Sequence, residues 1–352
     1  GFINAVAGSA AAAVLVGIAG RAMSAATSAA NGVREAIALP KPVTSAPPIP
    51  AGAELGLRGL SAVVTSNDTF YRIDTALQVP RIDPAQWKLR IVGLVDREIE
   101  IGYDELLALP MTETVATLMC VSNEIGGNLI GNAVWLGYPI RELLKKAGPQ
   151  AGADMVLSTS QDGWTASTPL DVLLDDKRDA IFAVAMNGEP LPLAHGFPVR
   201  MVVPGLYGYV SATKWVTELR VTRFADDVAY WTVRGWSDRG PIKTSSRIDV
   251  PRTGKTVEAG TVAVAGFAWA QHTGIAGVDV RIDGGEWVPA RLADAINADT
   301  WVQWVYEWNA TAGNHVIEAR ATDAAGGEQS GTPVSVIPNG AEGYHTISVS
   351  VA

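Results

Sequence analysis

The cysteine at position 120 has the clearest chemical potential in this sequence, because the chain contains one cysteine and therefore no intrachain disulfide. A lone cysteine is a buried apolar residue, a reactive thiol or a ligand for a soft metal ion. Ser122, Asn123, Gly126 and Gly127 follow it, after an apolar run that is typical of a strand. Small and polar residues of this kind predict a loop whose backbone amides face a ligand.

A second group of candidate residues is basic. His195 and Arg200 lie in a segment rich in glycine and proline, and Lys214 follows a second such segment at 203–208. A guanidinium, an ammonium and an imidazole brought together by tight turns suit an anion such as a phosphate. Ordinary solvated charges in loops are the alternative interpretation of the same residues.

Several other site chemistries find no support in the sequence. The four histidines and the single cysteine are scattered, so no zinc-type ligand cluster is predicted. Neither a phosphate-binding glycine loop after a strand nor a Gly-x-Ser-x-Gly nucleophile motif occurs. The formal net charge of −9, without any basic run, argues against a nucleic-acid partner.

The 352 residues suffice for two domains with sizeable cores. Composition divides the chain into four parts: an apolar segment at 1–30, a proline-rich linker at 31–55, a mixed domain at 56–249 and a strand-rich domain at 250–352. The linker is expected to be stiff and extended, and to separate the apolar segment from the body of the protein.

The apolar segment at 1–30 opens with an uncharged stretch rich in alanine, valine and glycine. About 20 apolar residues span a bilayer as a helix, so this stretch is barely long enough. It is a membrane anchor, the apolar region of a signal peptide, or a buried helix of the soluble body. We favour the anchor, which predicts a protein of the cell membrane with an extracytoplasmic globular part.

The mixed domain is expected to have an α+β fold, because predicted strands alternate with short predicted helices. The strands are expected at 87–93, 199–204 and 216–222, and the helices at 102–110, 138–148 and 169–175. Beyond position 250, short strands recur at 261–270, 278–283, 301–308, 315–322 and 345–352. Regular short strands over about 100 residues are typical of an immunoglobulin-like β-sandwich, although the paired cysteines of antibody domains are absent.

Five motifs together resemble the sulfite oxidase family of molybdopterin enzymes. They occur in the family's order and cover 67–72, 120–123, 187–192, 195–200 and 214–215. The resemblance extends from about position 56 to position 352. It implies a mixed α/β molybdopterin-binding domain followed by an immunoglobulin-like domain of the dimerisation type, and hence a homodimer.

The resemblance also implies the chemistry. The family's molybdenum ion is held by the dithiolene of one molybdopterin, and Cys120 would be its protein ligand. Such an enzyme moves an oxygen atom between water and a small donor or acceptor molecule. Its two electrons would leave through an external electron carrier or haem subunit, since the chain has no Cys-x-x-Cys-His motif. The residues expected around the cofactor are Asn67, Tyr71, Arg72, Cys120, Ser122, Asp162, His195, Arg200, Ala212, Thr213 and Lys214, with a plain turn before glycine as the alternative role of Asp162.

The sequence departs from the family where sulfite oxidases bind their substrate. Lys88 stands in place of one arginine, and Glu124 and Ile125 stand where two arginines follow the cysteine. Trp236 occupies the approximate place of a tyrosine near the metal. Loss of guanidinium groups weakens sulfite binding, and a carboxylate repels an oxyanion.

These departures leave the substrate open between sulfite-like and sulfoxide-like molecules. The molybdenum-dependent methionine sulfoxide reductases, which also lack a sulfite-type pocket, are a reasonable model. Sulfite remains an alternative if Lys88 replaces the missing arginines as a catalytic residue. A cofactor-free binding or assembly module at a membrane is the alternative of a different class, and Glu124 and Ile125 favour it.

Overall fold

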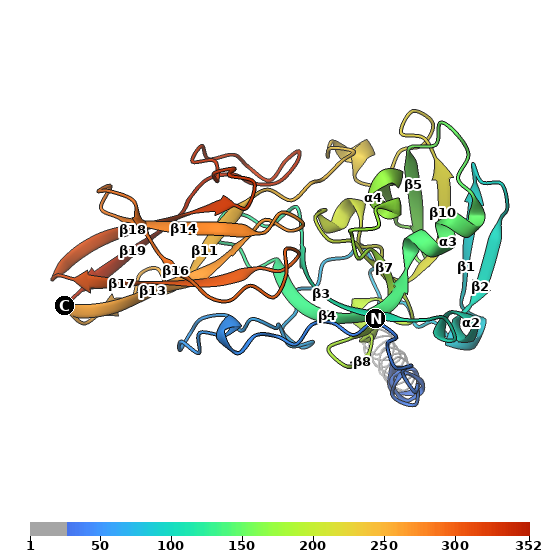
Figure 1. Ribbon diagram of the computed structural model, residues 1–352, viewed down its shortest axis with the longest axis horizontal. Coiled ribbons are helices and arrows are strands. Elements are labelled where there is room, and N and C mark those ends of the chain that lie inside the picture. The colour runs from blue at the N-terminus through green and yellow to red at the C-terminus, as the bar shows by residue number, and fades with distance from the viewer. Residues whose placement is uncertain (1–26) are drawn as a thin grey trace, which may run out of the picture.

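The computed structural model describes residues 27–352 and has two lobes, a mixed domain and a β-sandwich, joined end to end (Figure 1). The prediction of a membrane anchor rests on residues 1–30 and lies outside the described part, apart from 27–30. Among the described residues, no helix has the length and apolar content needed to cross a bilayer.

The mixed domain contains two five-stranded sheets, which supply the strands of the predicted α+β fold. In the first sheet β1 and β10 pair in parallel and the other neighbours are antiparallel. Its order is β2 (Ile99–Gly102), β1 (Lys88–Gly93), β10 (Val216–Thr222), β5 (Met155–Ser160) and β6 (Thr165–Pro169). The second sheet contains β3 (Thr112–Met119), β4 (Ile130–Pro139), β7 (Ile181–Met186) and β8 (Glu189–Pro190), with β9 (Arg200–Val202) beside β7.

The three predicted helices of this domain are present but shorter than expected. They are α2 (Tyr103–Leu107), α3 (Ile140–Ala147) and α4 (Leu170–Leu174). α3 buries Ile140, Leu143 and Leu144 against the core and ends at Gly148, whose φ of 70° suits a residue without a side chain. It begins late because Tyr138 and Pro139 still pair within the second sheet.

The C-terminal domain is the predicted sandwich. One sheet has the order β11 (Ser245–Val250), β13 (Gly260–Trp269), β17 (Val302–Ala310) and β16 (Arg291–Leu292). The other has the order β12 (Thr256–Val257), β19 (His345–Val351), β18 (Gly313–Asp323), β14 (Ile275–Ile282) and β15 (Val288–Pro289). Because β11 begins at Ser245, the sandwich starts a few residues before the predicted boundary at 250.

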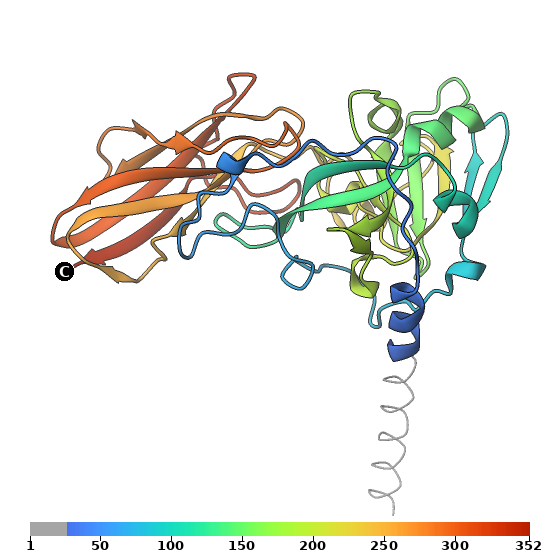
Figure 2. The same cartoon turned by 60° about the horizontal axis from the view of Figure 1, so that its bottom comes forward.

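The proline-rich segment at 31–55 is extended for much of its length but is not a free linker. Its first residues continue a helix from position 27, where Arg34 is buried and pairs with Glu189 at 2.7 Å. Further along, Thr44 forms a parallel bridge with Thr112 at the start of β3. Figure 2 shows the blue segment lying along both lobes. The expectation of a separating spacer was therefore wrong, because an extended chain offers its backbone groups to a neighbouring sheet edge.

Candidate active site

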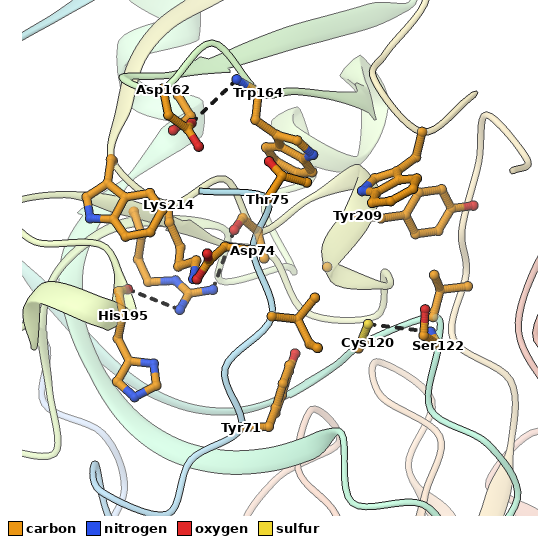
Figure 3. Close-up of a pocket in the computed structure, with 18 of the residues that line it drawn as sticks. Tyr71, Asp74, Thr75, Cys120, Ser122, Asp162, Trp164, His195, Tyr209 and Lys214 are labelled. Atoms are coloured by element: carbon orange, nitrogen blue, oxygen red, sulfur yellow. Dashed lines mark hydrogen bonds and ion pairs between the residues drawn. The ribbon is translucent and has the colours of Figure 1, made fainter. Parts of the chain in front are cut away.

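A pocket in the mixed domain brings together most of the predicted site residues. Its walls come from the loop after β3, the segment before β9, the turns between β9 and β10, and the chain at 70–75 (Figure 3). The predicted residues that line it are Tyr71, Cys120, Ser122, Asp162, His195, Arg200, Ala212 and Lys214.

Cys120 is placed by a closed loop between β3 and β4. The amide of Cys120 donates to the carbonyl of Leu129 at 2.9 Å, and the Asn123 carboxamide oxygen accepts from the Leu129 amide at 2.7 Å. The thiol is 8% exposed, and the amide of Ser122 donates to Sγ at 3.4 Å. Burial raises the pKa of the thiol above its usual range, and the Ser122 amide opposes this. A bound cationic metal is the kind of partner that would turn this thiol into a thiolate.

Arg200 is a buried cation without an anionic partner among residues 27–352. It is 5% exposed, and its guanidinium donates to the carbonyls of Met201, His195 and Ala212 at 3.4, 3.2 and 3.5 Å. Desolvation lowers the pKa of Arg200 to about 10. A buried cation whose hydrogen bonds all go to neutral oxygens is a ready site for an anion.

Lys214 lies beside this group but already has a counterion. Its ammonium contacts the Asp74 carboxylate at 2.7 Å and the carbonyl of Ala194 at 3.2 Å. Burial lowers the pKa of Lys214 to about 8, although Asp74 opposes the shift. Asp74 was not predicted, and its own pKa is held low by Arg72 and Lys214 against the effect of burial.

His195 is a neutral imidazole in this site. Burial, reinforced by Arg200, lowers its pKa to about 4. Its Nε2 lies 3.1 Å from the carbonyl oxygen of Asn67, so Nε2 carries the proton and donates. Asn67 was expected to contact the cofactor, but its side chain bonds to Met186 and Glu189 instead. Asn67 therefore orients His195 from outside the pocket wall.

Gly196 allows His195, Arg200 and Lys214 to converge. Its φ is 112°, and a Cβ atom there would lie 2.9 Å from Cβ of Arg200 and 3.2 Å from Cβ of Lys214. Both the conformation and the space favour glycine.

Besides Asn67, three predicted residues lie outside the pocket lining. Lys88 is on the exposed face of β1, where it pairs with Glu100 at 2.5 Å, so its expected role at the substrate was wrong. The reason is strand alternation: Trp87 is buried, and the next side chain points to the opposite face. Arg72 is half-exposed and pairs with Asp74, and Thr213 is buried against Ser158 at 2.7 Å.

An aromatic wall that sequence reasoning missed completes the pocket. It comprises Trp164, Tyr209, Trp231 and Trp236, and only Trp236 was singled out beforehand. The ring of Trp236 lies 5.9 Å from that of Tyr209 and 6.3 Å from that of Trp231. The eleven tryptophans of the chain indicated β structure in the sequence, and nothing in their spacing indicated that some of them line a pocket.

The pocket is thus divided into a polar and an aromatic part. Figure 3 shows His195, Lys214 and Asp74 across the pocket from Cys120 and Tyr209. Ser160 also lines the pocket, and its buried hydroxyl has no partner among the described residues. The polar part can hold an anionic group, and the aromatic part can hold an uncharged molecule beside the thiol.

Comparison with known proteins agrees with this division of the chain. Residues 76–231 match the family model for an oxidoreductase molybdopterin-binding domain, and residues 245–349 match a bacterial Ig domain. The chain is 31% identical over 273 residues to mitochondrial sulfite oxidase of Macaca fascicularis, covering 65% of this chain and 49% of that protein. It is 29% identical over 348 residues to sulfite oxidase of Gallus gallus, covering 85% of this chain and 72% of that protein.

A solved structure shares most of the fold. The sulfane dehydrogenase SoxCD from Paracoccus pantotrophus aligns with a TM-score of 0.69 over 81% of each chain, at 23% sequence identity. The chain spans about half the length of the mammalian relatives it matches.

Proposed function

Since this chain belongs to the sulfite oxidase family of molybdopterin-dependent oxidoreductases, we propose that it transfers an oxygen atom between water and a small substrate. The observation that carries the proposal is one pocket lined by a buried thiol and by a buried guanidinium that has no anionic partner in the described part of the chain. The two groups match the two ends of the family's cofactor, a soft metal and an anionic pterin phosphate.

The residues of the pocket fit molybdopterin. Arg200 would meet the phosphate, because it is a buried cation that lacks a counterion among residues 27–352, and the Ser160 hydroxyl, which has no partner in the same range, offers a further polar contact. His195 is a neutral ring whose Nε2 donates to the Asn67 carbonyl, so its Nδ1 would accept a hydrogen bond, and Cys120 would ligate the metal. The bound molybdenum supplies two-electron redox chemistry. The protein holds the cofactor in place and excludes water with its aromatic wall.

For the substrate we favour an uncharged sulfoxide over sulfite. The aromatic part of the pocket includes Tyr209, Trp231 and Trp236, whose rings repel anions and attract polarisable sulfur. Lys88, the residue that would have bound sulfite, lies on another surface. The overall reaction would be a sulfoxide plus two electrons and two protons giving a thioether and water. An external one-electron carrier would supply the electrons.

Metal analysis of the purified full chain tests the cofactor. We expect molybdenum and releasable pterin, and a Mo(V) electron paramagnetic resonance signal that is lost or altered in Cys120→Ser, because oxygen replaces a sulfur ligand. An unchanged signal in that variant would refute the assignment of Cys120. Protein without molybdenum or pterin would favour the cofactor-free binding module.

Steady-state assays test the substrate. Methyl phenyl sulfoxide with dithionite-reduced viologen is expected to react with a higher kcat/KM than sulfite with ferricyanide. Trp236→Ala is expected to raise KM for the sulfoxide without changing molybdenum content. Preferential turnover of sulfite would sink the substrate proposal and leave the cofactor assignment intact.

We also propose a cellular location, an electron donor and an oligomeric state for the enzyme from its sequence. An apolar segment at 1–20 supports tethering to the cell membrane with the globular part outside the cytoplasm. The single cysteine supports electron delivery by a separate carrier or haem subunit, and the C-terminal sandwich supports a homodimer. Membrane fractionation and sedimentation equilibrium of the purified protein test the first and last of these points.

A further inference from the structure

The loop that carries Cys120 is in direct contact with the C-terminal sandwich. We infer that His345 and Arg247 of the sandwich are positioning residues for the Cys120 thiol. The inference rests on the proposed function only in taking Cys120 as the metal ligand. It gives the immunoglobulin-like domain a role in the active site in addition to the role in assembly proposed above.

His345 connects the two sheets of the sandwich to the loop. It is the first residue of β19, and its Nδ1 accepts from the amide of Ile248 in β11 at 2.9 Å. The proton is therefore on Nε2, which faces Gly126. A Cβ atom at Gly126 would lie 2.3 Å from Nε2, and Gly126 has a φ of +73°. The loop thus turns tightly against the imidazole, and glycine is required at the contact.

Arg247 holds the next residue of the loop. Its Nη1 donates to the carbonyl of Gly127 at 2.5 Å. The guanidinium is fixed by Asp249 at 2.8 Å and by the Ser61 hydroxyl at 3.2 Å, and it lies over the ring of Phe267. A guanidinium with so many partners has little rotational freedom, so it defines where Gly127 lies.

The loop transmits this position to the thiol through short hydrogen bonds. Gly127 packs on Asn123: a Cβ atom at 127 would lie 2.7 Å from the Asn123 carboxamide oxygen. That oxygen accepts from the Leu129 amide at 2.7 Å, and the amide of Asn123 donates to the carbonyl of Cys120 at 3.1 Å. Asn123 is 2% exposed, so the bonds are protected from water.

The strand that leads into Cys120 is held from the same domain. The amide of Thr117 in β3 donates to the carbonyl of Asp299 at 3.0 Å, and the Asn297 carboxamide donates to the carbonyl of Val115 at 2.9 Å. Both residues belong to the segment before β17. The sandwich therefore contacts the chain on both sides of the cysteine.

Thiol labelling of the cofactor-free full chain tests the inference, because the chain has one cysteine. Protein from a host that makes no molybdopterin would be treated with Ellman's reagent at fixed pH. Opening the loop exposes the thiol, so His345→Ala and Arg247→Met are expected to raise the labelling rate roughly fivefold or more. His345→Asn keeps an acceptor for the Ile248 amide and is expected to restore most of the protection.

His315→Ala is the matched control. His315 lies in β18 of the same domain, where its ring bonds to Asp283 at 2.7 Å and to the carbonyl of Thr311 at 2.8 Å rather than to the Cys120 loop. Its replacement is expected to leave the labelling rate unchanged. In cofactor-loaded protein, His345→Ala and Arg247→Met are expected to change the g-values of the Mo(V) signal, which report the orientation of the thiolate.

Labelling rates of both variants within twofold of the wild type, in folded protein, would overturn the inference. If His345→Ala does not fold, the labelling rate of Arg247→Lys is compared with that of the wild type instead. This variant keeps the positive charge but loses the planar guanidinium with its several donors. The labelling requires no metal. Absence of molybdenum would therefore refute the proposed function while the labelling result still decides the inference.

Discussion

Replacing Arg200 with methionine is expected to stabilise the cofactor-free protein while weakening its hold on molybdopterin. Arg200 is 5% exposed, and burial lowers its pKa from 12.5 to about 10. At about 1.4 kcal/mol per pKa unit, the buried charge costs about 3 kcal/mol relative to the unfolded chain. A phosphate in contact with the guanidinium would remove most of this cost.

The stabilisation has an offset that can be worked from the same contacts. The three hydrogen bonds to carbonyl groups are long, at 3.2 to 3.5 Å, and losing them with the contact to the Trp135 ring costs about 1–2 kcal/mol together. The net expectation for Arg200→Met is a gain of about 1–2 kcal/mol in the free energy of unfolding of cofactor-free protein. Methionine fills most of the space of the arginine stem.

Urea unfolding followed by tryptophan fluorescence measures this change as a shift in the midpoint at constant m-value. The molybdenum content of the same variant, expressed with the cofactor available, is expected to fall at least about tenfold, since a charge-assisted contact is lost. Arg178→Met is the control, because Arg178 is largely buried outside the pocket and should leave cofactor content unchanged. A destabilised Arg200→Met variant with normal molybdenum content would refute the reasoning.

Three further predictions follow from the geometry of the site. Lys88→Ala is expected to keep molybdenum content and kcat/KM within about twofold of the wild type, because Lys88 forms an exposed pair with Glu100 on another surface. A larger loss in either assay would support a role for Lys88 in substrate binding. The folded-state pKa of His195, about 4, is below the unfolded value of 6.5. The unfolded chain therefore binds more protons, and the His195 contribution to the free energy of unfolding should fall by up to about 3 kcal/mol as the pH is lowered from 6.5 to 4. Over this interval the free energy of unfolding of His195→Gln should depend less on pH than that of the wild type. Gly196→Ala is expected to destabilise the protein by about 1–3 kcal/mol and to lower its molybdenum content, since the φ of 112° and the nearby Cβ of Arg200 leave no room for a side chain. A variant with wild-type stability and wild-type molybdenum content would contradict this close approach.

The sequence by itself was sufficient for the features that depend on local pattern. Alternating apolar residues predicted β1, and strand-like segments bounded by turns predicted β10 and the strands of the sandwich. The order of the motifs around Cys120, His195 and Arg200 predicted the family, and these three residues do line one pocket. A motif is defined by residue types and their order, and the sequence gives both directly.

Only the tertiary structure decided what those residues face. The position of Lys88 follows from its direction in β1, and one residue along a strand reverses that direction. The aromatic wall brings together Trp164, Tyr209 and Trp236, which are spread over more than seventy residues of sequence, and no local sequence pattern predicts that they line one pocket. The same is true of His345 against the Cys120 loop. Long-range packing places these groups, so the sequence by itself identified the cysteine that we propose as the metal ligand, while the folded chain determined what surrounds it.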